Sequence, residues 1–172
     1  MSLETMQDLL VQQLKDLHSA EQQITKALPK LAKTAANRTL ADAFRNHLAE
    51  TEGQIARLEQ IFDSLSTSPR GKKCKGMEGL LEEGAETLRE DGDDAVIDAA
   101  LIADAQRVEH YEIAAYGTVK ALANQLGHSQ MAKLLDQTLK EEIQADQTLT
   151  RIAEQEVNPQ ASASRAGAES EE

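Results

Sequence analysis

Three glutamates occupy positions where a helical core calls for Leu or Ile. Glu21, Glu112 and Glu142 each continue a run of apolar residues at alternating steps of three and four, the spacing of one buried helix face. An unpaired ionised carboxylate in a core costs several kcal/mol, so isolated core glutamates are rare. Three of them on separate segments favour one common explanation, a bound metal pair whose charge neutralises clustered carboxylates.

Further ligand candidates lie within one helical turn of these positions. Glu109 precedes Glu112 by three residues, and Asp146 follows Glu142 by four. In the remaining long segment the matching stripe position is a threonine, next to Glu50, and His47 precedes Glu50 by three. Such spacings put both side chains of a pair on one helix face. Oxygen-rich ligation with little nitrogen suits Fe or Mn more than Zn or Cu. The candidate metal ligands are therefore Glu21, Glu50, Glu112, Glu142, Glu109, Asp146 and His47, with no catalytic residue assigned.

Simpler explanations compete for individual residues. Glu21 alone is more typical of a boundary residue that reaches an arginine or solvent, and the acids together could be protonated or paired with Arg57, Arg107 or Arg151. Tyr111 and Tyr116, on either side of Glu112, favour bundle packing with a bonded hydroxyl. Cys74, in a lysine-rich loop, is most simply a bystander thiol. These alternatives stay open at the level of sequence.

Four long periodic segments must position the acids. They predict helices of about 33 residues containing Pro29, then about 40–65, 94–126 and a fourth with its apolar stripe at 135–152. The first two join by about two residues, as do the last two, so each pair forms an antiparallel hairpin. About 28 residues with a short helix near 77–90 connect the hairpins. The predicted fold is all-α, a four-helix bundle with a long crossover that contains a fifth short helix, which is the ferritin-like arrangement.

The composition limits the partners and the compartment. The 172 residues include 18 Lys and Arg against 30 Asp and Glu, a net charge of -12, which disfavours nucleic acid and anionic membranes and favours metal ions. No apolar run approaches the ~20 residues of a membrane span, and the N-terminus lacks the features of a secretory signal. We therefore expect a cytoplasmic protein. Residues 1–156 form the predicted bundle, and the small, polar residues 157–172 are predicted to be a disordered tail.

The sequence also resembles a known family. The stretch AQRVEHYEIAAYG at 105–117, with KDLHSAE at 15–21, HLAET at 47–51, CKGMEG at 74–79 and QLGH at 125–128, is similar to the YciF-like, stress-associated branch of the ferritin-like superfamily. The resemblance covers about residues 3–156. It implies a bundle with a fifth short helix, a dinuclear iron site, a homodimer and a link to bacterial stress responses. Carried over by position, it places the metal carboxylates at Glu21, Glu50, Glu112 and Glu142, with Glu109 and Asp146 nearby.

The chain departs from the family pattern at two places. His18 stands where many relatives have tyrosine, and some relatives carry a histidine just after the pair Glu50-Thr51. Neither hairpin contains a plain Glu-x-x-His, which puts nitrogen ligation in question. The first hypothesis for function is a dinuclear metal protein with two Fe ions, or Mn, that oxidises ferrous ion or consumes peroxide during stress. The alternatives are a non-enzymatic dimeric stress or adaptor protein with a degenerate or structural metal site, and a simple metal buffer.

Overall fold

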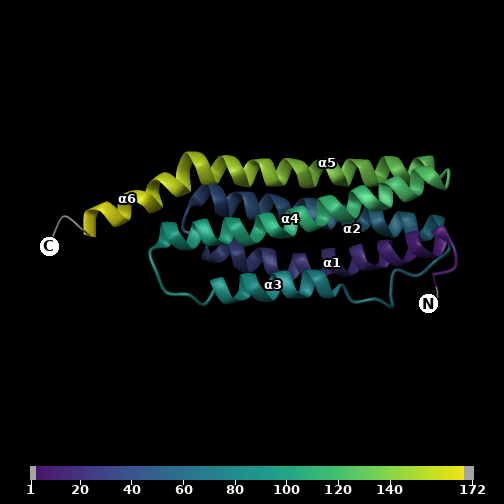
Figure 1. The fold of residues 1–172 in the computed structure, drawn as a ribbon, viewed down its shortest axis with the longest axis horizontal. Helices are drawn as coiled ribbons and strands as arrows, with labels where there is room; N and C mark the ends of the chain where they lie inside the picture. Colours follow the sequence, from purple (N-terminus) through teal and green to yellow (C-terminus); the bar gives the residue numbers. More distant parts are fainter. Residues whose placement is uncertain (1–2, 169–172) are drawn as a thin grey trace.

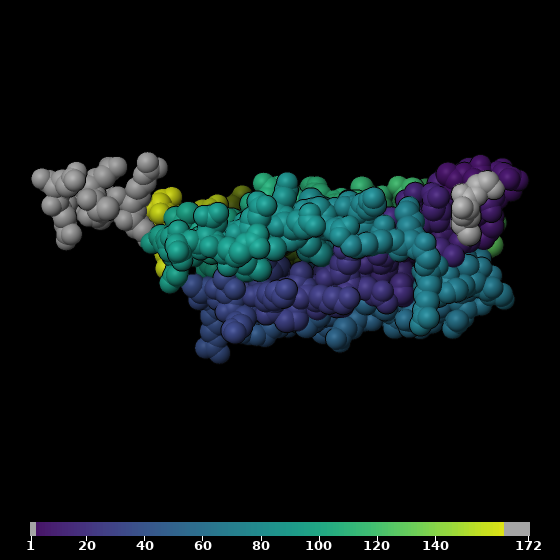
Figure 2. Space-filling view, turned by 90° about the horizontal axis from the view of Figure 1, so that it is seen from below, coloured from purple at the N-terminus to yellow at the C-terminus, as the bar shows by residue number. Residues whose placement is uncertain are grey.

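The computed structural model of this protein describes residues 3–168, and every regular element among them is helical. Four long helices run side by side along one axis (Figure 1): α1 (Met6–Thr34), α2 (Arg38–Ser64), α4 (Asp94–Gln125) and α5 (Ser129–Ile152). The short helix α3 (Lys75–Thr87) belongs to the crossover and contacts α1 and α4. In Figure 2 the teal α3 region lies along the outside of the bundle, beside the blue α1–α2 hairpin. The predicted four-helix bundle with a long crossover and a fifth short helix is confirmed.

Tight turns close both hairpins. Asn37 is the N-cap of α2, where its side chain accepts a hydrogen bond from the backbone N–H of Leu40 at 2.9 Å. The helix therefore begins at Arg38, close to the predicted start at about residue 40, because asparagine satisfies an otherwise unpaired donor of the first turn. At the α4–α5 turn, Gly127 has a φ of 77°, the left-handed conformation expected of a glycine that ends a helix.

The core consists of two apolar clusters with a polar layer between them. One cluster surrounds Leu28, Phe44 and Leu101, and the other surrounds Leu14 and Phe62. Along each long helix, the apolar residues of one cluster give way to buried polar residues before those of the other begin. The bundle therefore holds its polar groups at mid-length, with water-excluding packing on both sides.

The C-terminal segment is helical over its described part, where the sequence composition predicted a disordered tail. A widened helical turn, η1 (Ala153–Val157), follows α5 and leads into α6 (Asn158–Ala168). Val157 is buried, η1 and α6 contact α4, and the Asn37 side chain donates a hydrogen bond to Glu156 at 3.2 Å. This tertiary anchor outweighs the small, polar composition. In Figure 1, α6 continues past the end of the bundle. The last four positions of the expected tail lie outside the described residues.

Candidate metal centre

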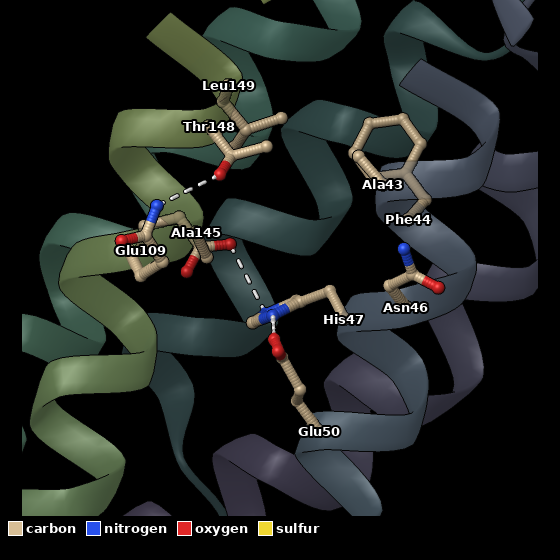
Figure 3. A pocket seen from close by; sticks show the side chains of 10 residues that line it. Ala43, Phe44, Asn46, His47, Glu50, Glu109, Ala145, Thr148 and Leu149 are labelled. Carbon is tan, nitrogen blue, oxygen red and sulfur yellow. Dashed lines mark hydrogen bonds and ion pairs between the residues drawn. The ribbon is translucent and has the colours of Figure 1, made fainter. Parts of the chain in front are cut away.

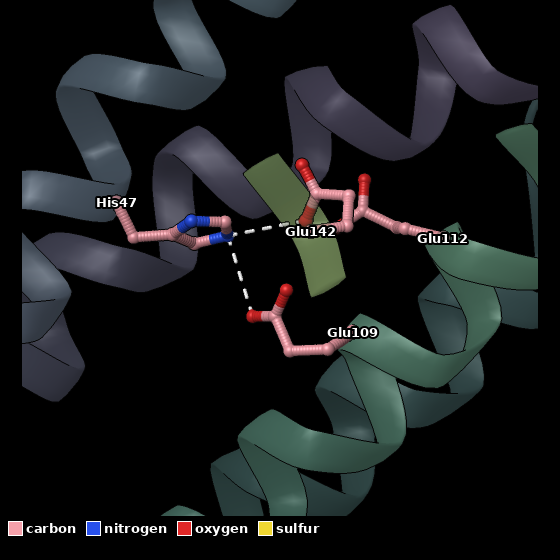
Figure 4. A group of neighbouring side chains, drawn as sticks. All are labelled: His47, Glu109, Glu112 and Glu142. Carbon is pink, nitrogen blue, oxygen red and sulfur yellow. Dashed lines mark ion pairs between the residues drawn. The ribbon is translucent and has the colours of Figure 1, made fainter. Parts of the chain in front are cut away.

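Four buried ligand-type side chains meet in the polar layer (Figure 4). His47 comes from α2, Glu109 and Glu112 from α4, and Glu142 from α5, and one ligand atom of each lies within 4.8 Å of the others. They are 7%, 3%, 0% and 0% exposed. Glu109 and Glu112 point the same way because they are three residues apart on one helix. The sequence hypothesis that acids from separate helices share the centre of the bundle is thus realised in the geometry.

Glu21 adds a fifth side chain, from α1. It is fully buried, and one carboxylate oxygen accepts a hydrogen bond from the Tyr116 hydroxyl while the other oxygen has no partner. Burial, and then the negative charge of Glu142, raise the pKa of Glu21 to about 8. Glu21 therefore belongs to the same electrostatic cluster. We call Glu21, His47, Glu109, Glu112 and Glu142 the acid cluster.

The acids repel one another in a poorly solvated space. Burial is the first cause that raises the pKa of Glu109 and of Glu112 well above the usual value, and the charges of their neighbours add to it. For Glu109 the next cause is Glu142, and for Glu112 it is Glu21. Burial likewise raises the pKa of Tyr116 well above the usual value, with Glu21 next. Without added positive charge, the carboxylates can be ionised together only at high free energy.

Many atoms of the acid cluster have no hydrogen-bond partner. They are both ring nitrogens of His47, both oxygens of Glu112, and one oxygen each of Glu21, Glu109 and Glu142. His47 Nε2 lies 3.3 Å from Glu109 and 3.8 Å from Glu142. A buried polar atom without a partner costs about 1–3 kcal/mol, so a native protein seldom leaves one unexplained. Apart from His47 Nδ1, which faces Glu50, these atoms belong to the buried centre of the bundle. Such a group fits a bound cation, because carboxylate oxygens and an imidazole nitrogen are the donors that a hard or borderline metal uses.

Two side chains outside the predicted ligand set hold the acids in place. Gln54 donates a hydrogen bond to one oxygen of Glu142, and Tyr116 does the same for Glu21. Thr51 is buried beside them and donates to the backbone carbonyl of His47 at 2.8 Å. Gln54 follows Thr51 by three residues, so the helical spacing that marked the other positions could have identified it.

Two of the seven predicted ligands lie outside the acid cluster. The Glu50 side chain is 49% exposed, with its carboxylate 3.5 Å from His47 Nδ1. Asp146 is 21% exposed, 3.3 Å from His110 Nε2, and accepts a hydrogen bond from Gln106. The structure therefore brings together Glu21, His47, Glu109, Glu112 and Glu142.

Arginines considered as partners of the acids make other pairs. Arg57 pairs with Glu141, on the outer side of the cluster, and donates to Thr138 at 3.0 Å. Arg107 pairs with Asp104 at 2.6 Å. Neither arginine makes an ion pair with an acid of the cluster, although the charge of Arg57 acts to lower the pKa of Glu21.

Comparisons with known proteins place the chain in a family. The model of the domain of unknown function DUF892 matches residues 5–162. The chain is 48% identical over 162 residues to Protein YciF of Escherichia coli (strain K12), covering 94% of this chain and 98% of that protein. None of the helices within residues 3–168 has the length and apolar character of a membrane span.

Solved structures agree with this assignment. The crystal structure of the E. coli stress protein YciF superposes with a TM-score of 0.87 at 48% identity, over 90% of this chain and 98% of that one. YcfI from Rhodopseudomonas palustris gives 0.84 at 48% identity, over 87% and 95%. A Xanthomonas campestris protein with 18% identity and a TM-score of 0.74, over 94% and 99%, shares the fold. The chain belongs to the DUF892 family, the family of YciF, and is built as a ferritin-like helical bundle.

Proposed function

We propose that the acid cluster binds two divalent metal ions, Fe or Mn, and that the protein uses them in a stress response. The observation that supports this most directly is the set of seven buried ligand atoms without partners. Charge supplies a second argument. The cluster contains the four carboxylates Glu21, Glu109, Glu112 and Glu142, which carry four negative charges when ionised, and two divalent cations would balance them.

The donor set selects the kind of metal. Four carboxylates and one imidazole offer mainly hard oxygen donors, which suit Fe(II) and Mn(II) better than thiolate-preferring ions. Bound Fe or Mn would supply electron transfer to a small oxygen species. The chain itself orients the ligands: Tyr116 fixes one oxygen of Glu21, and Gln54 fixes one oxygen of Glu142. The apolar clusters on both sides keep bulk water away.

The reaction proposed is oxidation of ferrous ion or consumption of peroxide. It rests on the similarity to the E. coli stress protein YciF together with the metal-type cluster. A cytoplasmic homodimer that needs neither nucleic acid nor a membrane completes the proposal, as the resemblance and the acidic composition imply.

One observation favours a second candidate, a non-enzymatic helical protein. The α2 position facing Glu142 is Gln54, a neutral amide that donates a hydrogen bond to that acid. The raised pKa values of Glu21, Glu109 and Glu112 would let these acids remain neutral without metal. The relative YcfI is provisionally described as a structural protein. A third possibility is a metal buffer, which would bind metal as in the first candidate but catalyse no reaction, as in the second.

Metal analysis of full-length protein purified without chelator tests these functions. We expect about two Fe or Mn ions per chain, and loss of bound metal in Glu142→Gln. Glu52→Gln removes an exposed acid from α2 and should keep the metal. Anaerobic loading with ferrous ion, followed by exposure to oxygen or peroxide, then measures turnover. Metal without turnover favours the buffer, and a folded protein that binds no Fe or Mn contradicts the proposal.

A further inference from the structure

A small pocket opens between α2 and α5 directly beside the acid cluster. Its cavity volume is about 150 Å³, and its walls include Glu50, His47, Glu109 and Ala145. Figure 3 shows His47 between Glu50 and Glu109, with one ring nitrogen directed at each carboxylate. The side chains form a series that passes from an exposed acid, through the imidazole, to a buried acid.

Exposure falls steadily along that series. The side chains of Glu50, His47 and Glu109 are 49%, 8% and 4% exposed. The imidazole lies 3.5 Å from the first carboxylate and 3.3 Å from the second, and neither ring nitrogen makes a hydrogen bond. The imidazole is thus the middle member of the series, within ion-pair distance of an acid on each side.

The pocket shares lining residues with a larger surface hollow. Glu50 and Gln144 line both the pocket and a neighbouring hollow, whose other charged side chains are Lys133, Asp136, Lys140 and Glu141. Asp136 pairs with Lys140 and Glu141 pairs with Arg57. Glu50 thus stands where the open surface narrows to the buried space. A carboxylate at such a constriction raises the local concentration of cations.

From this geometry we infer that the pocket between α2 and α5 is the port through which a hydrated divalent cation reaches the acid cluster, with Glu50 as the receiving carboxylate at its mouth. The inference rests on the proposed metal function.

The size of the pocket and the charge of its walls indicate what passes through it. About 150 Å³ accommodates an ion with a few waters, whereas organic ligands occupy pockets of roughly 300–1,000 Å³. The carboxylates at the two ends of the series offer the oxygen donors that a divalent cation prefers.

Ala145 makes the port possible. It follows Glu142 by three residues on α5 and lines the pocket with a single methyl group. A larger side chain there would fill part of the passage without touching the charges. Two different substitutions, one of charge and one of size, can therefore test the same route.

The test separates the rate of metal uptake from the equilibrium capacity. Chelator-stripped, full-length protein is mixed with Co²⁺ in a stopped-flow instrument, and uptake is followed by tyrosine fluorescence, since the chain has two tyrosines and no tryptophan and Tyr116 contacts Glu21. Equilibrium dialysis gives the final stoichiometry. Glu50→Gln should slow uptake roughly five-fold at low salt, and the ratio to wild type should shrink as salt rises. Ala145→Leu should also slow uptake, at unchanged final stoichiometry.

The control is Glu52→Gln, an exposed acid of α2 that does not line the port, and its uptake rate should match wild type. Wild-type rates in both Glu50→Gln and Ala145→Leu would place the port elsewhere. A lower stoichiometry in Glu50→Gln would make Glu50 a ligand and overturn its role at the mouth. If wild-type protein takes up no Co²⁺, the proposed metal function fails along with the port, whereas normal capacity with unaltered rates removes only the port.

Discussion

Two polar clusters within one bundle have opposite hydrogen-bonding states. In the acid cluster, seven buried ligand atoms lack partners. The second cluster consists of Asp16, Lys72, Cys74 and Tyr111, and we call it the Cys74 cluster. Each of its side chains has a hydrogen-bond or ion-pair partner. The Tyr111 hydroxyl donates to Asp16 at 2.7 Å, Lys72 pairs with the other Asp16 oxygen at 3.0 Å, and the Cys74 sulfur lies 2.9 Å from the Tyr111 oxygen.

The two clusters also differ in the direction of their pKa shifts. Burial works to raise the pKa of Asp16, but hydrogen bonds from Cys74 and Tyr111 and the charge of Lys72 outweigh it, so the pKa lies below the usual value. In the acid cluster the pKa of Glu21 rises to about 8 because burial acts first and the charge of Glu142 adds to it. Burial alone therefore does not mark a functional site.

Neighbouring residues on α4 separate the two roles. Tyr111 faces α3 and the crossover, and Glu112 faces the bundle centre, since successive helical side chains differ by about 100°. The Cys74 cluster is complete within the chain and fixes α3 on the bundle. The acid cluster is incomplete within the chain, and its missing partners are the positive charges that our proposal assigns to metal.

The largest expected effect comes from removing one carboxylate of the acid cluster. Glu112→Gln keeps the side-chain volume and removes a charge whose two oxygens have no partner. Metal affinity should fall on the order of 100-fold or more, since even outer residues of metal sites contribute 10–100-fold. The metal-free protein should become more stable at pH 8, because a costly buried charge disappears. Dialysis with Mn²⁺ and urea unfolding measure the two effects. A variant with wild-type affinity and lower metal-free stability would contradict this account.

The second effect is a loss of metal-free stability as pH rises. An unperturbed glutamate has a pKa of 4.5, whereas Glu21 in the folded protein has a pKa of about 8, so between these values the native state binds more protons than the unfolded state. Its stabilising contribution is complete at low pH and disappears as pH rises from about 4.5 to 8, an effect of several kcal/mol. Glu109 and Glu112 act in the same direction.

Other groups do not reverse this trend. Burial lowers the pKa of His18, so the contribution of His18 to the stability of the fold increases as pH rises. It is a single residue, however, and acts against three acids. The pKa of Asp16 lies below the ordinary aspartate value of 3.8, so its contribution is lost only at lower pH. Urea unfolding at pH 5.5 and pH 8 should show the decrease without metal and recover stability at pH 8 with Mn²⁺. An increase in metal-free stability between these pH values would refute the assignment of unpaired acids.

The Cys74 cluster predicts a smaller and purely structural effect. Asp16→Ala removes the acceptor of the Tyr111 hydroxyl and the partner of Lys72, which should destabilise the protein by about 2 kcal/mol. Metal stoichiometry should not change. The matched control is Asp42→Ala, whose exposed pair with Arg45 should contribute less than about 1 kcal/mol. Loss of metal in Asp16→Ala would show that the two clusters are not independent.

Sequence periodicity is sufficient for the arrangement of helices and for the centre of the site. It predicts the third long helix at about 94–126, and that helix runs from Asp94 to Gln125. It identifies Glu21, Glu112 and Glu142 because mid-helix acids on two antiparallel hairpins must meet at the same level. These inferences require only the spacing of apolar residues along each segment and the number of residues that connect the segments.

Rotation of a helix about its axis is harder to predict. Residues 50 and 51 differ by about 100°, so once Thr51 faces the core, Glu50 faces outward and Gln54 faces inward. Both the spacing of Glu50 from His47 and the family resemblance instead point to Glu50 as a ligand. The helical tail escapes prediction for a different reason: alanine and serine in that segment are compatible with helix or disorder, and the burial of Val157 against the bundle decides.

The smallest effect tests how tightly the Cys74 cluster is packed. A Cβ added at Gly76 would lie 2.8 Å from Cε2 of Tyr111, whereas one at Gly79, in the same helix, meets no atom within 4 Å. Alanine is favoured over glycine in a helix by up to about 1 kcal/mol, so Gly79→Ala should stabilise the protein. Gly76→Ala should lose that gain and destabilise by roughly 1 kcal/mol, because the ring must move away from Asp16. Urea unfolding of the two variants gives the comparison. Equal stabilisation by both would mean that Tyr111 can shift freely, and the Cys74 cluster would then not be the rigid counterpart of the acid cluster.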